Sequence, residues 1–382
     1  MVGSDVNSEG AALRYVVEDA PTGYGDAADR LVRAVRDAGT RVEYRGWSNT
    51  RAGAAPALMH CARDPLPHEL AQPGAPTVVH LVPEYLPLVR SVVADGAFVS
   101  HTVWESDRLP QHWPDLLNAT DLVMVPTEWN REVFVGSGVR TPVAVVPHVA
   151  TVPVPGDRGT SMGLRDDDFV FYTIGRWDER KAVFLTLEAY LRAFTADDPV
   201  VLVVKTNPRL EMPPGEWGAS NPLAWTTAWQ VASLVKQHRK PARVHLEVEL
   251  WDDDRIAGLH TRGDCYVTLA RGEGWGLGAF DASAHGNPVV ATGWGGFLEY
   301  LDDESAFLVD HTLAAVEHNA FASYSPDQQW AAPDLDHAVD VLRAVVADPD
   351  AARVRAARAR DRVLDRYAPE RVAATFLDAL SR

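Results

Sequence analysis

The sequence has few cysteines, no long apolar run and no excess of positive charge. Its 382 residues include only two cysteines, Cys61 and Cys265, which offer neither a disulfide framework nor the spacing of a zinc site. We expect both to be small buried residues in a reducing cytosol. No apolar run reaches the roughly 18 residues that span a bilayer, and the first ten residues lack the pattern of a secretory signal. These absences predict a cytoplasmic protein without stable membrane association.

Positive charge is scarce as well. The chain has 36 Lys and Arg residues against 53 Asp and Glu residues, which gives a net charge of −17. Such a charge disfavours nucleic acid and anionic membranes as partners. The apolar content of 46% and the charged content of 23% are typical of a soluble globular protein. Its richness in Ala, Arg, Val and Asp hints at a bacterial source with GC-rich DNA.

Strand-like and helix-like patterns alternate along the chain. Apolar runs predict strands at residues 13–17, 41–44, 77–81, 98–100, 121–125, 143–146, 169–174, 200–204, 244–248, 265–268 and 289–291. Helices are predicted at residues 26–38 and 182–194, and from residue 335 to the end with a break near Pro369. This alternation predicts mostly parallel sheets covered by helices, an α/β fold. The Pro- and Gly-containing stretch 149–163 is the best linker candidate, so we predict domains at residues 1–150 and 151–368 that face a central cleft.

A glycine-rich segment, residues 271–300, is the most informative part of the chain. Glu273 lies among glycines, and Asp281 follows eight residues later. Glycines let a backbone come close to a ligand, and acidic side chains can hold hydroxyl groups. A helix is predicted over residues 280–285, and amide groups at a helix N-terminus favour phosphate. A site for a ligand that is both sugar and phosphate is therefore predicted here.

The same segment resembles the donor site of the retaining glycosyltransferases of family four. That family has two acidic residues eight positions apart, then a Gly-x-Pro-Val-Val-Ala-Thr strand and a Gly-Gly-x-x-Glu turn, in the order found here. One departure is Asp281, where the family has Glu. The resemblance implies a GT-B fold of two Rossmann-like domains, with the acceptor side in residues 1–150 and the nucleotide-sugar donor in residues 151–368. It also implies that a final helix, residues 369–382, packs back on the first domain.

A second motif, GRWDERK at residues 175–181, directly follows the predicted strand 169–174. Family members have a Gly-Arg…Lys segment here that clamps the donor diphosphate, and by matching Arg176 and Lys181 take that role. A fixed guanidinium and ammonium would stabilise the negative charge of a departing nucleoside diphosphate. The alternative is a solvated charge cluster that caps a helix.

A third feature is His101, at the end of a predicted strand. The resemblance implies that it points at the transferred sugar, whereas a lone histidine there is otherwise a satisfied structural residue. Trp104 and Glu105 follow closely and are candidates for contact with the acceptor, with packing and surface solvation as the alternatives.

The resemblance also assigns the remaining site residues. The proposed catalytic set is His101, Arg176, Lys181 and Glu273. Glu273 would hold sugar hydroxyls, the amides of Trp275, Gly276 and Leu277 would face sugar and phosphate, and Asp281 would bind the ribose diol with a shorter reach. The base is placed near Glu249, Leu250 and Trp251. No bound metal or cofactor is expected, because the nucleotide-sugar is a co-substrate and the cations neutralise its diphosphate.

The segment GYGDAA at residues 23–28 supports a different function. It fits a dinucleotide-binding fingerprint, with Glu43 on the next strand, which would indicate an NAD-dependent oxidoreductase. Family-four enzymes also have a glycine-rich first loop, so Gly23 and Gly25 are assigned to the donor. The preferred prediction is a retaining, metal-independent hexosyltransferase that uses a UDP- or GDP-linked sugar and a soluble hydroxyl acceptor. The oxidoreductase, a nucleotide-sugar epimerase or phosphorylase, and a non-catalytic sugar-nucleotide-binding subunit remain alternatives.

Overall fold

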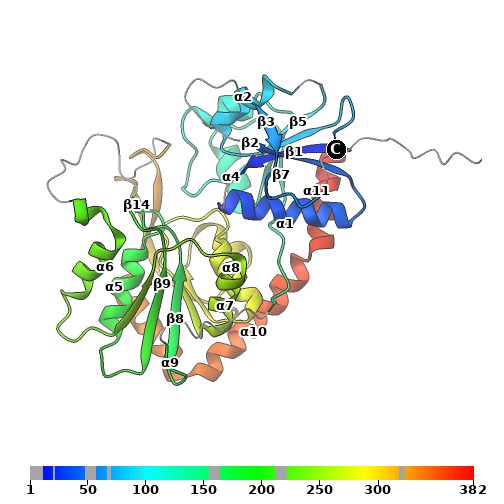
Figure 1. Cartoon of the computed structure of the whole chain (residues 1–382). Helices are drawn as coiled ribbons and strands as arrows, with labels where there is room; N and C mark the ends of the chain where they lie inside the picture. The colour runs from blue at the N-terminus through cyan, green and yellow to red at the C-terminus, as the bar shows by residue number, and fades with distance from the viewer. Residues whose placement is uncertain are drawn as a thin grey trace, which may run out of the picture. The chain divides into compact units, whose positions relative to one another are not determined.

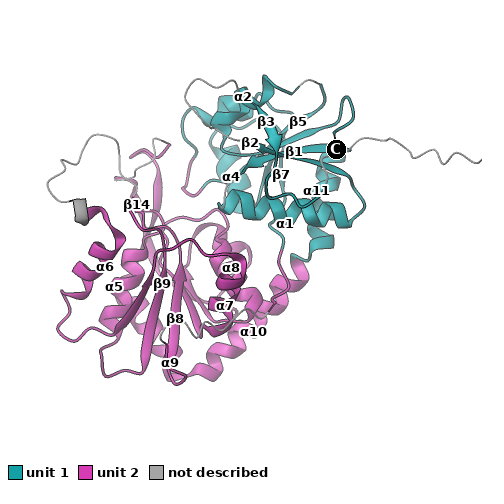
Figure 2. Cartoon of the chain, viewed as in Figure 1, with its two compact units in different colours: residues 1–104, 109–149, 367–382 teal, residues 105–108, 150–366 magenta. Residues whose placement is uncertain are grey.

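The computed structural model describes residues 12–19, 22–47, 57–66, 70–93, 95–154, 164–210, 222–317 and 323–382. The chain divides into two compact units, which Figure 2 shows in different colours. Unit 1 comprises residues 1–104, 109–149 and 367–382, and unit 2 comprises residues 105–108 and 150–366. Residues 155–163 of the predicted linker, and the first ten residues, lie outside the described part of the chain.

Unit 1 is built on a seven-stranded sheet with the order β3-β2-β1-β4-β5-β6-β7. The strands are β1 (Leu13–Glu18), β2 (Val42–Trp47), β3 (Leu58–His60), β4 (Thr77–His80), β5 (Phe98–His101), β6 (Leu122–Val125) and β7 (Val143–Val145). All neighbouring strands are parallel except β3, a short antiparallel edge strand that the sequence patterns did not predict.

The helices of unit 1 are α1 (Gly23–Asp37), η1 (Pro83–Tyr85), α2 (Leu86–Arg90), α3 (Trp113–Leu117), α4 (Glu128–Gly136) and α11 (Pro369–Ser381). Helix α1 begins where the Thr22 side chain accepts a hydrogen bond from the Gly25 amide, at 3.2 Å. The C-terminal helix α11 lies along α1 (Figure 1) and brings Phe376 to within 6.1 Å of Tyr15, measured between ring centroids. The last helix of the chain thus helps to form the core of unit 1.

Unit 2 is built on a six-stranded, fully parallel sheet with the order β10-β9-β8-β11-β12-β13. The strands are β8 (Phe169–Ile174), β9 (Val200–Lys205), β10 (Arg243–Glu247), β11 (Cys265–Thr268), β12 (Val289–Thr292) and β13 (Phe307–Val309). A separate antiparallel pair joins β14 (His311–Ala315) to β15 (Gln329–Pro333). The central strands are almost continuously apolar because helices cover both faces of a parallel sheet.

The helices of unit 2 are α5 (Val183–Ala193), η3 (Pro222–Trp225), α6 (Thr227–Val235), α7 (Asp253–Arg262), α8 (Leu277–His285), η4 (Gly295–Glu299), α9 (Leu335–Ala347) and α10 (Pro349–Arg366). The predicted C-terminal helical region therefore has a second break, at Asp348 before Pro349, in addition to the one before Pro369. The two parallel sheets with their helices confirm the predicted α/β fold class.

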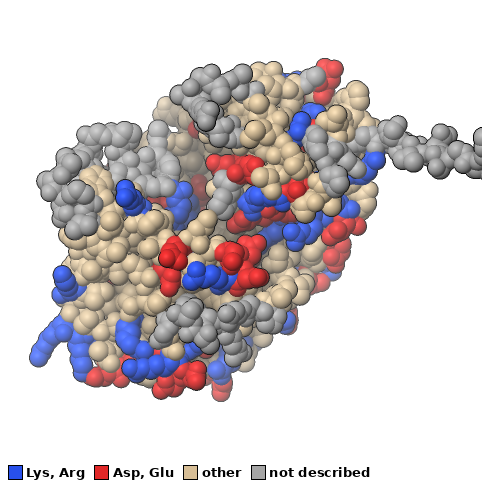
Figure 3. All heavy atoms as spheres, in the orientation of Figure 1, with Lys and Arg blue, Asp and Glu red and all other residues tan. Residues whose placement is uncertain are grey.

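Other properties of the described residues concern the surface and the cysteines. No described helix combines the length and the apolar character needed to cross a membrane. On the face of the molecule shown in Figure 3, Lys and Arg side chains are interspersed with Asp and Glu. Cys61 and Cys265 are buried and free.

Candidate functional site

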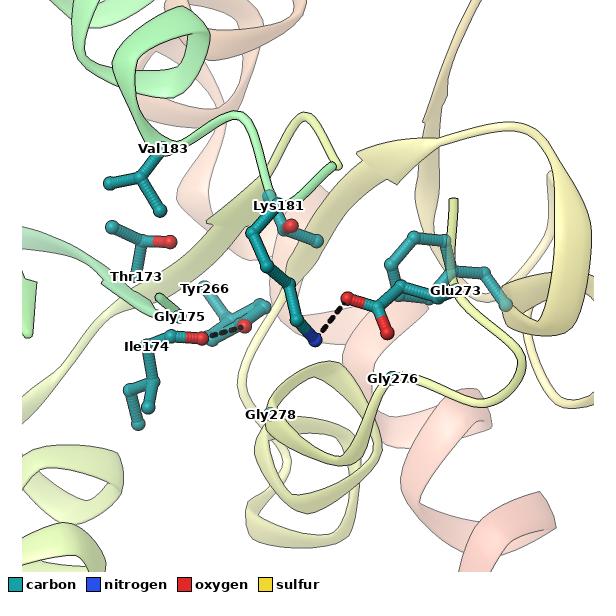
Figure 4. Close-up of a pocket in the computed structure, with 11 residues that line it drawn as sticks. Thr173, Ile174, Gly175, Lys181, Val183, Tyr266, Glu273, Gly276 and Gly278 are labelled. Carbon is teal, nitrogen blue, oxygen red and sulfur yellow. Dashed lines mark hydrogen bonds and ion pairs between the residues drawn. The ribbon is translucent and has the colours of Figure 1, made fainter. Parts of the chain in front are cut away.

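Two loops of unit 2 meet at one edge of its sheet. Strands β8 and β11 are parallel neighbours, so the loops that follow them emerge side by side. The Arg271 amide donates to the Arg180 carbonyl across these loops, at 2.7 Å. The pocket between them (Figure 4) is lined by Thr173, Ile174, Gly175, Lys181, Val183, Tyr266, Thr268, Glu273, Gly276, Gly278 and Phe297. The structure thus brings Lys181 and Glu273, predicted from separate motifs, into one pocket.

The Glu273 carboxylate is the central polar group of this pocket. The residue is 6% exposed, and its Oε1 accepts a hydrogen bond from the Lys181 ammonium (Figure 4). Its Oε2 lies 3.3 Å from Nη1 of Arg180. Burial alone would raise the pKa of Glu273, but Lys181 and Arg180 outweigh it and hold the pKa below its ordinary value. The carboxylate is therefore ionised and can accept hydrogen bonds from hydroxyl groups.

Arg180 was not among the residues predicted from the sequence. Besides its contact with Glu273, its Nη1 donates to the Gly272 carbonyl at 2.8 Å, and its Nη2 lies 3.7 Å from Oε1 of Glu105. Burial alone would lower the pKa of Arg180, but Glu105, Tyr324 and Glu273 outweigh it and raise this pKa well above its ordinary value. The only sequence signal for this residue was a second basic position directly before Lys181.

Trp104 and Glu105, the two residues predicted to contact an acceptor, both have side-chain contacts with other residues of the protein. Glu105 is not a solvated surface group, because its carboxylate is paired with Arg180 and accepts a hydrogen bond from the Tyr324 hydroxyl at 3.0 Å. Trp104 is 3% exposed, and its ring centroid lies 4.7 Å from that of Trp113. The Trp104 side chain therefore belongs to the core of unit 1, where packing accounts for it.

Arg176 is placed differently from Lys181. Its side chain is 47% exposed, and its Nε lies 3.9 Å from Oδ2 of Asp178, in the same loop. Asp178 also accepts a hydrogen bond from the Lys181 amide, at 2.7 Å, and so shapes the loop. The helix that follows, α5, has Ala182 as its N-cap and no side-chain cap, so this charged loop does not cap it. Arg176 is not one of the residues that line the pocket.

Helix α8 begins at Leu277, three residues earlier than the pattern predicted. Its N-cap is Gly276, which has a φ of 88° and no side chain that could occupy the first-turn amides. A Cβ at Gly276 would lie 2.3 Å from the Phe297 ring, and one at Gly278 would lie 2.4 Å from the Tyr266 hydroxyl. These glycines are therefore required by close packing inside the protein, independently of any ligand.

Trp275 and Asp281 flank this helix start. Trp275 is 2% exposed, with its ring against Phe280 and Tyr300, so only its backbone can face a ligand. Asp281 lies inside α8, after its first turn, and is not the helix cap. Its backbone carbonyl accepts a hydrogen bond from Nδ1 of His285 at 2.8 Å, and it does not line the pocket.

The residues predicted to hold a nucleotide base follow β10 at the same edge of the sheet. The side chains of Glu249 and Leu250 are largely exposed, and the exposed fraction of Leu250 is 79%. Trp251 is buried, and the guanidinium carbon of Arg255 lies 4.4 Å from its ring centroid. Leu250 is thus an exposed apolar side chain beside a buried aromatic one.

Unit 1 holds the other predicted site residues. His101 ends β5, is 1% exposed, and has its Nδ1 2.9 Å from the Tyr15 hydroxyl. Burial lowers the pKa of His101 to about 3, so the ring is neutral. Gly23 and Gly25 lie within the first turn of α1 rather than in a loop before it.

The dinucleotide interpretation of the first glycine motif is not supported. A dinucleotide-binding fold places its acidic residue at the carboxyl end of the second strand, near the ligand. Glu43 lies instead near the amino end of β2, where it pairs with Arg14 at 2.9 Å and Arg45 at 3.0 Å. It also accepts a hydrogen bond from the Ala71 amide. Glu43 is therefore a structural carboxylate that pairs with two arginines. Among the described residues, no group of three or more His, Cys, Asp or Glu side chains could hold a metal ion.

Comparisons with known structures identify the fold. HepE from Anabaena, in complex with UDP-glucose, matches with a TM-score of 0.68 and 13% identity over 97% of this chain and 99% of that one. Sucrose-phosphate synthase from Thermosynechococcus elongatus matches with a TM-score of 0.64 and 16% identity over 96% and 97%. TarM from S. aureus, in a complex that includes UDP, matches with a TM-score of 0.58 and 12% identity over 81% and 55%, so the chain spans little more than half of TarM. These likenesses show a GT-B fold.

The sequence itself matches one family. Among curated proteins none matches the chain. Residues 127–376 match the family described as Family 4 Glycosyltransferase in conflict systems. This match covers more than half of the chain and includes both loops of the pocket, and it confirms the resemblance seen in the sequence motifs. The chain therefore belongs to the family 4 glycosyltransferases in conflict systems.

Proposed function

We propose that this glycosyltransferase moves a hexose from a UDP-linked donor to a hydroxyl group of a soluble acceptor, with retention of the anomeric configuration. The acceptor oxygen forms its bond to the anomeric carbon on the face from which the diphosphate departs, as the bond from that carbon to the diphosphate breaks. The proton of the acceptor hydroxyl passes to the departing diphosphate. UDP is favoured over GDP because HepE and TarM, which share the fold, were solved with UDP or UDP-glucose. Glucose is the hexose named for HepE, and we extend only the class of sugar to this chain.

The ion pair between Lys181 and Glu273 is the observation that carries this proposal. An ionised carboxylate in a buried pocket suits a sugar, because hydroxyl groups can donate to it without competition from water. The ammonium beside it suits the diphosphate, whose negative charge grows as the bond to the sugar breaks. We propose that Lys181 turns from Glu273 to the diphosphate when the donor binds.

Three further groups complete the donor site in this proposal. Arg176, half exposed on the same loop, is the second cation for the diphosphate. The amides of Trp275, Gly276 and Leu277 stand at the start of α8, where the helix dipole favours negative charge. These groups neutralise the diphosphate with the protein's own charges and dipoles, so no metal is part of the proposal.

The nucleoside is assigned to the same sheet edge. Asp281 would bind the ribose diol from its place on α8, and the segment Glu249, Leu250 and Trp251 would hold the base. Exposed Leu250 offers an apolar contact for a planar base. In unit 1, His101 would form a hydrogen bond with a sugar hydroxyl, and Gly23 and Gly25 would admit the donor at the start of α1.

The test is thermal stabilisation of the full chain by nucleoside diphosphates. A ligand that binds only the native state raises the apparent free energy of unfolding by RT ln(1 + [L]/Kd). We expect UDP to raise the Tm more than GDP, TDP or ADP at equal concentration, and Asp281→Asn to reduce the UDP effect. As a matched control, Asp254→Asn on helix α7 should leave it unchanged. Stabilisation by NAD but by no nucleoside diphosphate would contradict the proposal.

Product analysis separates the remaining functions. With UDP-glucose and a surrogate alcohol, a transferase makes a glycoside and releases UDP. An epimerase changes the sugar without an acceptor, and a binding subunit leaves the donor intact. We expect release of UDP that depends on the alcohol.

A further inference from the structure

A tyrosine hydroxyl lies between two histidines inside unit 1. Tyr15, His80 and His101 come from the adjacent strands β1, β4 and β5. The Tyr15 hydroxyl oxygen is 2.9 Å from Nδ1 of His80 and 2.9 Å from Nδ1 of His101. All three residues are almost completely buried, and the two imidazole rings stack with centroids 4.0 Å apart and planes 9° from parallel. The three side chains form one hydrogen-bonded group.

The number of protons in this group restricts the two histidines. A phenol has one proton, so Tyr15 donates to one Nδ1 and must accept from the other. A neutral imidazole carries a proton on only one of its two nitrogens. Burial lowers the pKa of His80 well below its ordinary value, and that of His101 as well, so both rings are neutral. One histidine therefore carries its proton on Nδ1 and the other carries it on Nε2.

The surroundings of His101 indicate which histidine is which. Its Nε2 is buried and has no hydrogen-bond partner among the described residues. Buried N–H groups without a partner are rarer in native proteins than acceptors without one. The proton of His101 is thus placed on Nδ1, from which it is donated to the Tyr15 oxygen. Tyr15 in turn donates to Nδ1 of His80, whose own proton is on Nε2.

We propose that Tyr15 is a positioning residue that holds His101 in the Nδ1–H tautomer, so that Nε2 of His101 accepts a hydrogen bond from a hydroxyl group of the substrate. A bare imidazole nitrogen repels phosphate and carboxylate oxygens, which are acceptors too, so this atom selects a neutral hydroxyl. The assignment of that hydroxyl to the sugar rests on the proposed function, whereas the tautomers do not.

The glycine motif at the start of α1 supports this group structurally. Tyr24, between Gly23 and Gly25, has its ring centroid 5.2 Å from that of His80. Its hydroxyl is 3.1 Å from Oγ1 of Thr102, the residue after His101. The segment that resembled a dinucleotide fingerprint therefore packs against the histidine pair and fixes the chain beyond it.

The tautomers can be measured directly, without any substrate. In the full chain labelled with ¹⁵N-histidine, long-range ¹H–¹⁵N spectra at neutral pH distinguish protonated from bare ring nitrogens. The signals are assigned with the variants His80→Gln and His101→Gln. We expect His101 to carry its proton on Nδ1 and His80 on Nε2. The same tautomer in both residues, or a protonated Nε2 in His101, would overturn the proposal.

A pair of tyrosine variants tests whether Tyr15 is the cause. Tyr15→Phe removes the bridging hydroxyl and should give mixed tautomers in both histidines, with kcat for sugar transfer about tenfold lower and donor affinity unchanged. The control is Tyr44→Phe, because Tyr44 lies beside Tyr15 in the β1–β2 register, is also buried, and donates to Asp29 instead. It should leave the tautomers and kcat unchanged.

Unchanged tautomers in Tyr15→Phe would contradict the positioning role. If Tyr15→Phe does not fold, the wild-type spectrum still decides between the assigned tautomers and their opposites. The expected tautomers in a wild-type protein that transfers no sugar would support the tautomer assignment and overturn the proposed function.

Discussion

Arg180 and Lys181, adjacent in sequence, bind different oxygens of the same carboxylate: Nη1 of Arg180 lies 3.3 Å from Oε2 of Glu273, while Lys181 contacts Oε1. The Arg180 guanidinium is also fixed by the Gly272 carbonyl and by Glu105. Lys181 can therefore leave Glu273 for a ligand while the carboxylate keeps a positive partner. A buried carboxylate that lost both cations would be strongly disfavoured.

Arg180 is expected to contribute substantially to stability. Arg180→Met leaves Glu273 and Glu105 without this partner in a largely buried place, and loss of one member of such a pair costs on the order of 3 kcal/mol. Urea unfolding of the full chain measures the change. The matched control is Arg353→Met, whose pair with Asp350 is exposed and worth less than about 1 kcal/mol. Equal losses in the two variants would contradict the structural role of Arg180.

The Glu273 cluster should also give stability a pH dependence of known sign. Its pKa in the folded protein is below the ordinary value of 4.5, so its contribution is complete above that pH and is lost as the pH falls through the folded pKa. The stability difference between wild type and Glu273→Gln should therefore shrink on acidification below about pH 4.5. Urea midpoints measured at a series of pH values test this. Asp336→Asn, which breaks an exposed pair with Arg192, should show a much smaller difference throughout. A Glu273→Gln difference that grew on acidification would mean that the cations do not control this carboxylate.

Strands β8 to β12 of unit 2 could be predicted from sequence because their signals are local, whereas β13, β14 and β15 were not predicted. The apolar run of β8 lies between Asp168 and Gly175, and that of β11 follows Asp264; the predicted limits of both strands equal the observed ones. Strand β3 was missed because three residues at an antiparallel edge show no periodicity. The start of α8 was not predicted because Gly276 and Gly278 have a low helix propensity. The helix forms there because tertiary packing stabilises it.

The residues of the site could be predicted from sequence more readily than the contacts between them. Sequence motifs predicted that Lys181 and Glu273 contact a ligand. The contacts of Arg180 with Gly272 and Glu273 depend instead on how two loops, about 92 positions apart, meet at the edge of the sheet. Tyr15 and His101 are separated by 86 positions, and only the order of strands in the sheet brings them together. Side chains that act through another side chain leave no local pattern.

The cations of the pocket loop should act on turnover more than on folding. Lys181→Met and Arg176→Met each remove charge that stabilises the departing diphosphate, so kcat should fall by about 10²–10³. The control is Lys240→Met, which removes an exposed lysine paired with Asp197 in the same unit. Steady-state release of UDP from UDP-glucose measures the effect. A variant with the wild-type rate would identify its residue as a surface charge.

The packing of α8 against Tyr266 can be tested with a double-mutant cycle. Gly278→Ala would place its Cβ 2.4 Å from the Tyr266 hydroxyl, so it should destabilise the protein by about 1–3 kcal/mol. Tyr266→Phe removes the clashing oxygen, and Gly278→Ala should cost less in that background. Unfolding free energies of the four proteins give the coupling. Strict additivity would show that the hydroxyl does not limit this site.

The anomeric configuration of the product tests the account most directly. With an α-linked UDP-hexose and an accepted surrogate alcohol, NMR coupling constants should show an α-glycoside from the wild-type protein. Glu273→Gln keeps the volume of the side chain and removes its charge, so it should bind UDP with normal affinity and transfer sugar about 10²-fold more slowly or worse. A β-glycoside from the wild type, or full activity in Glu273→Gln, would contradict the central claim.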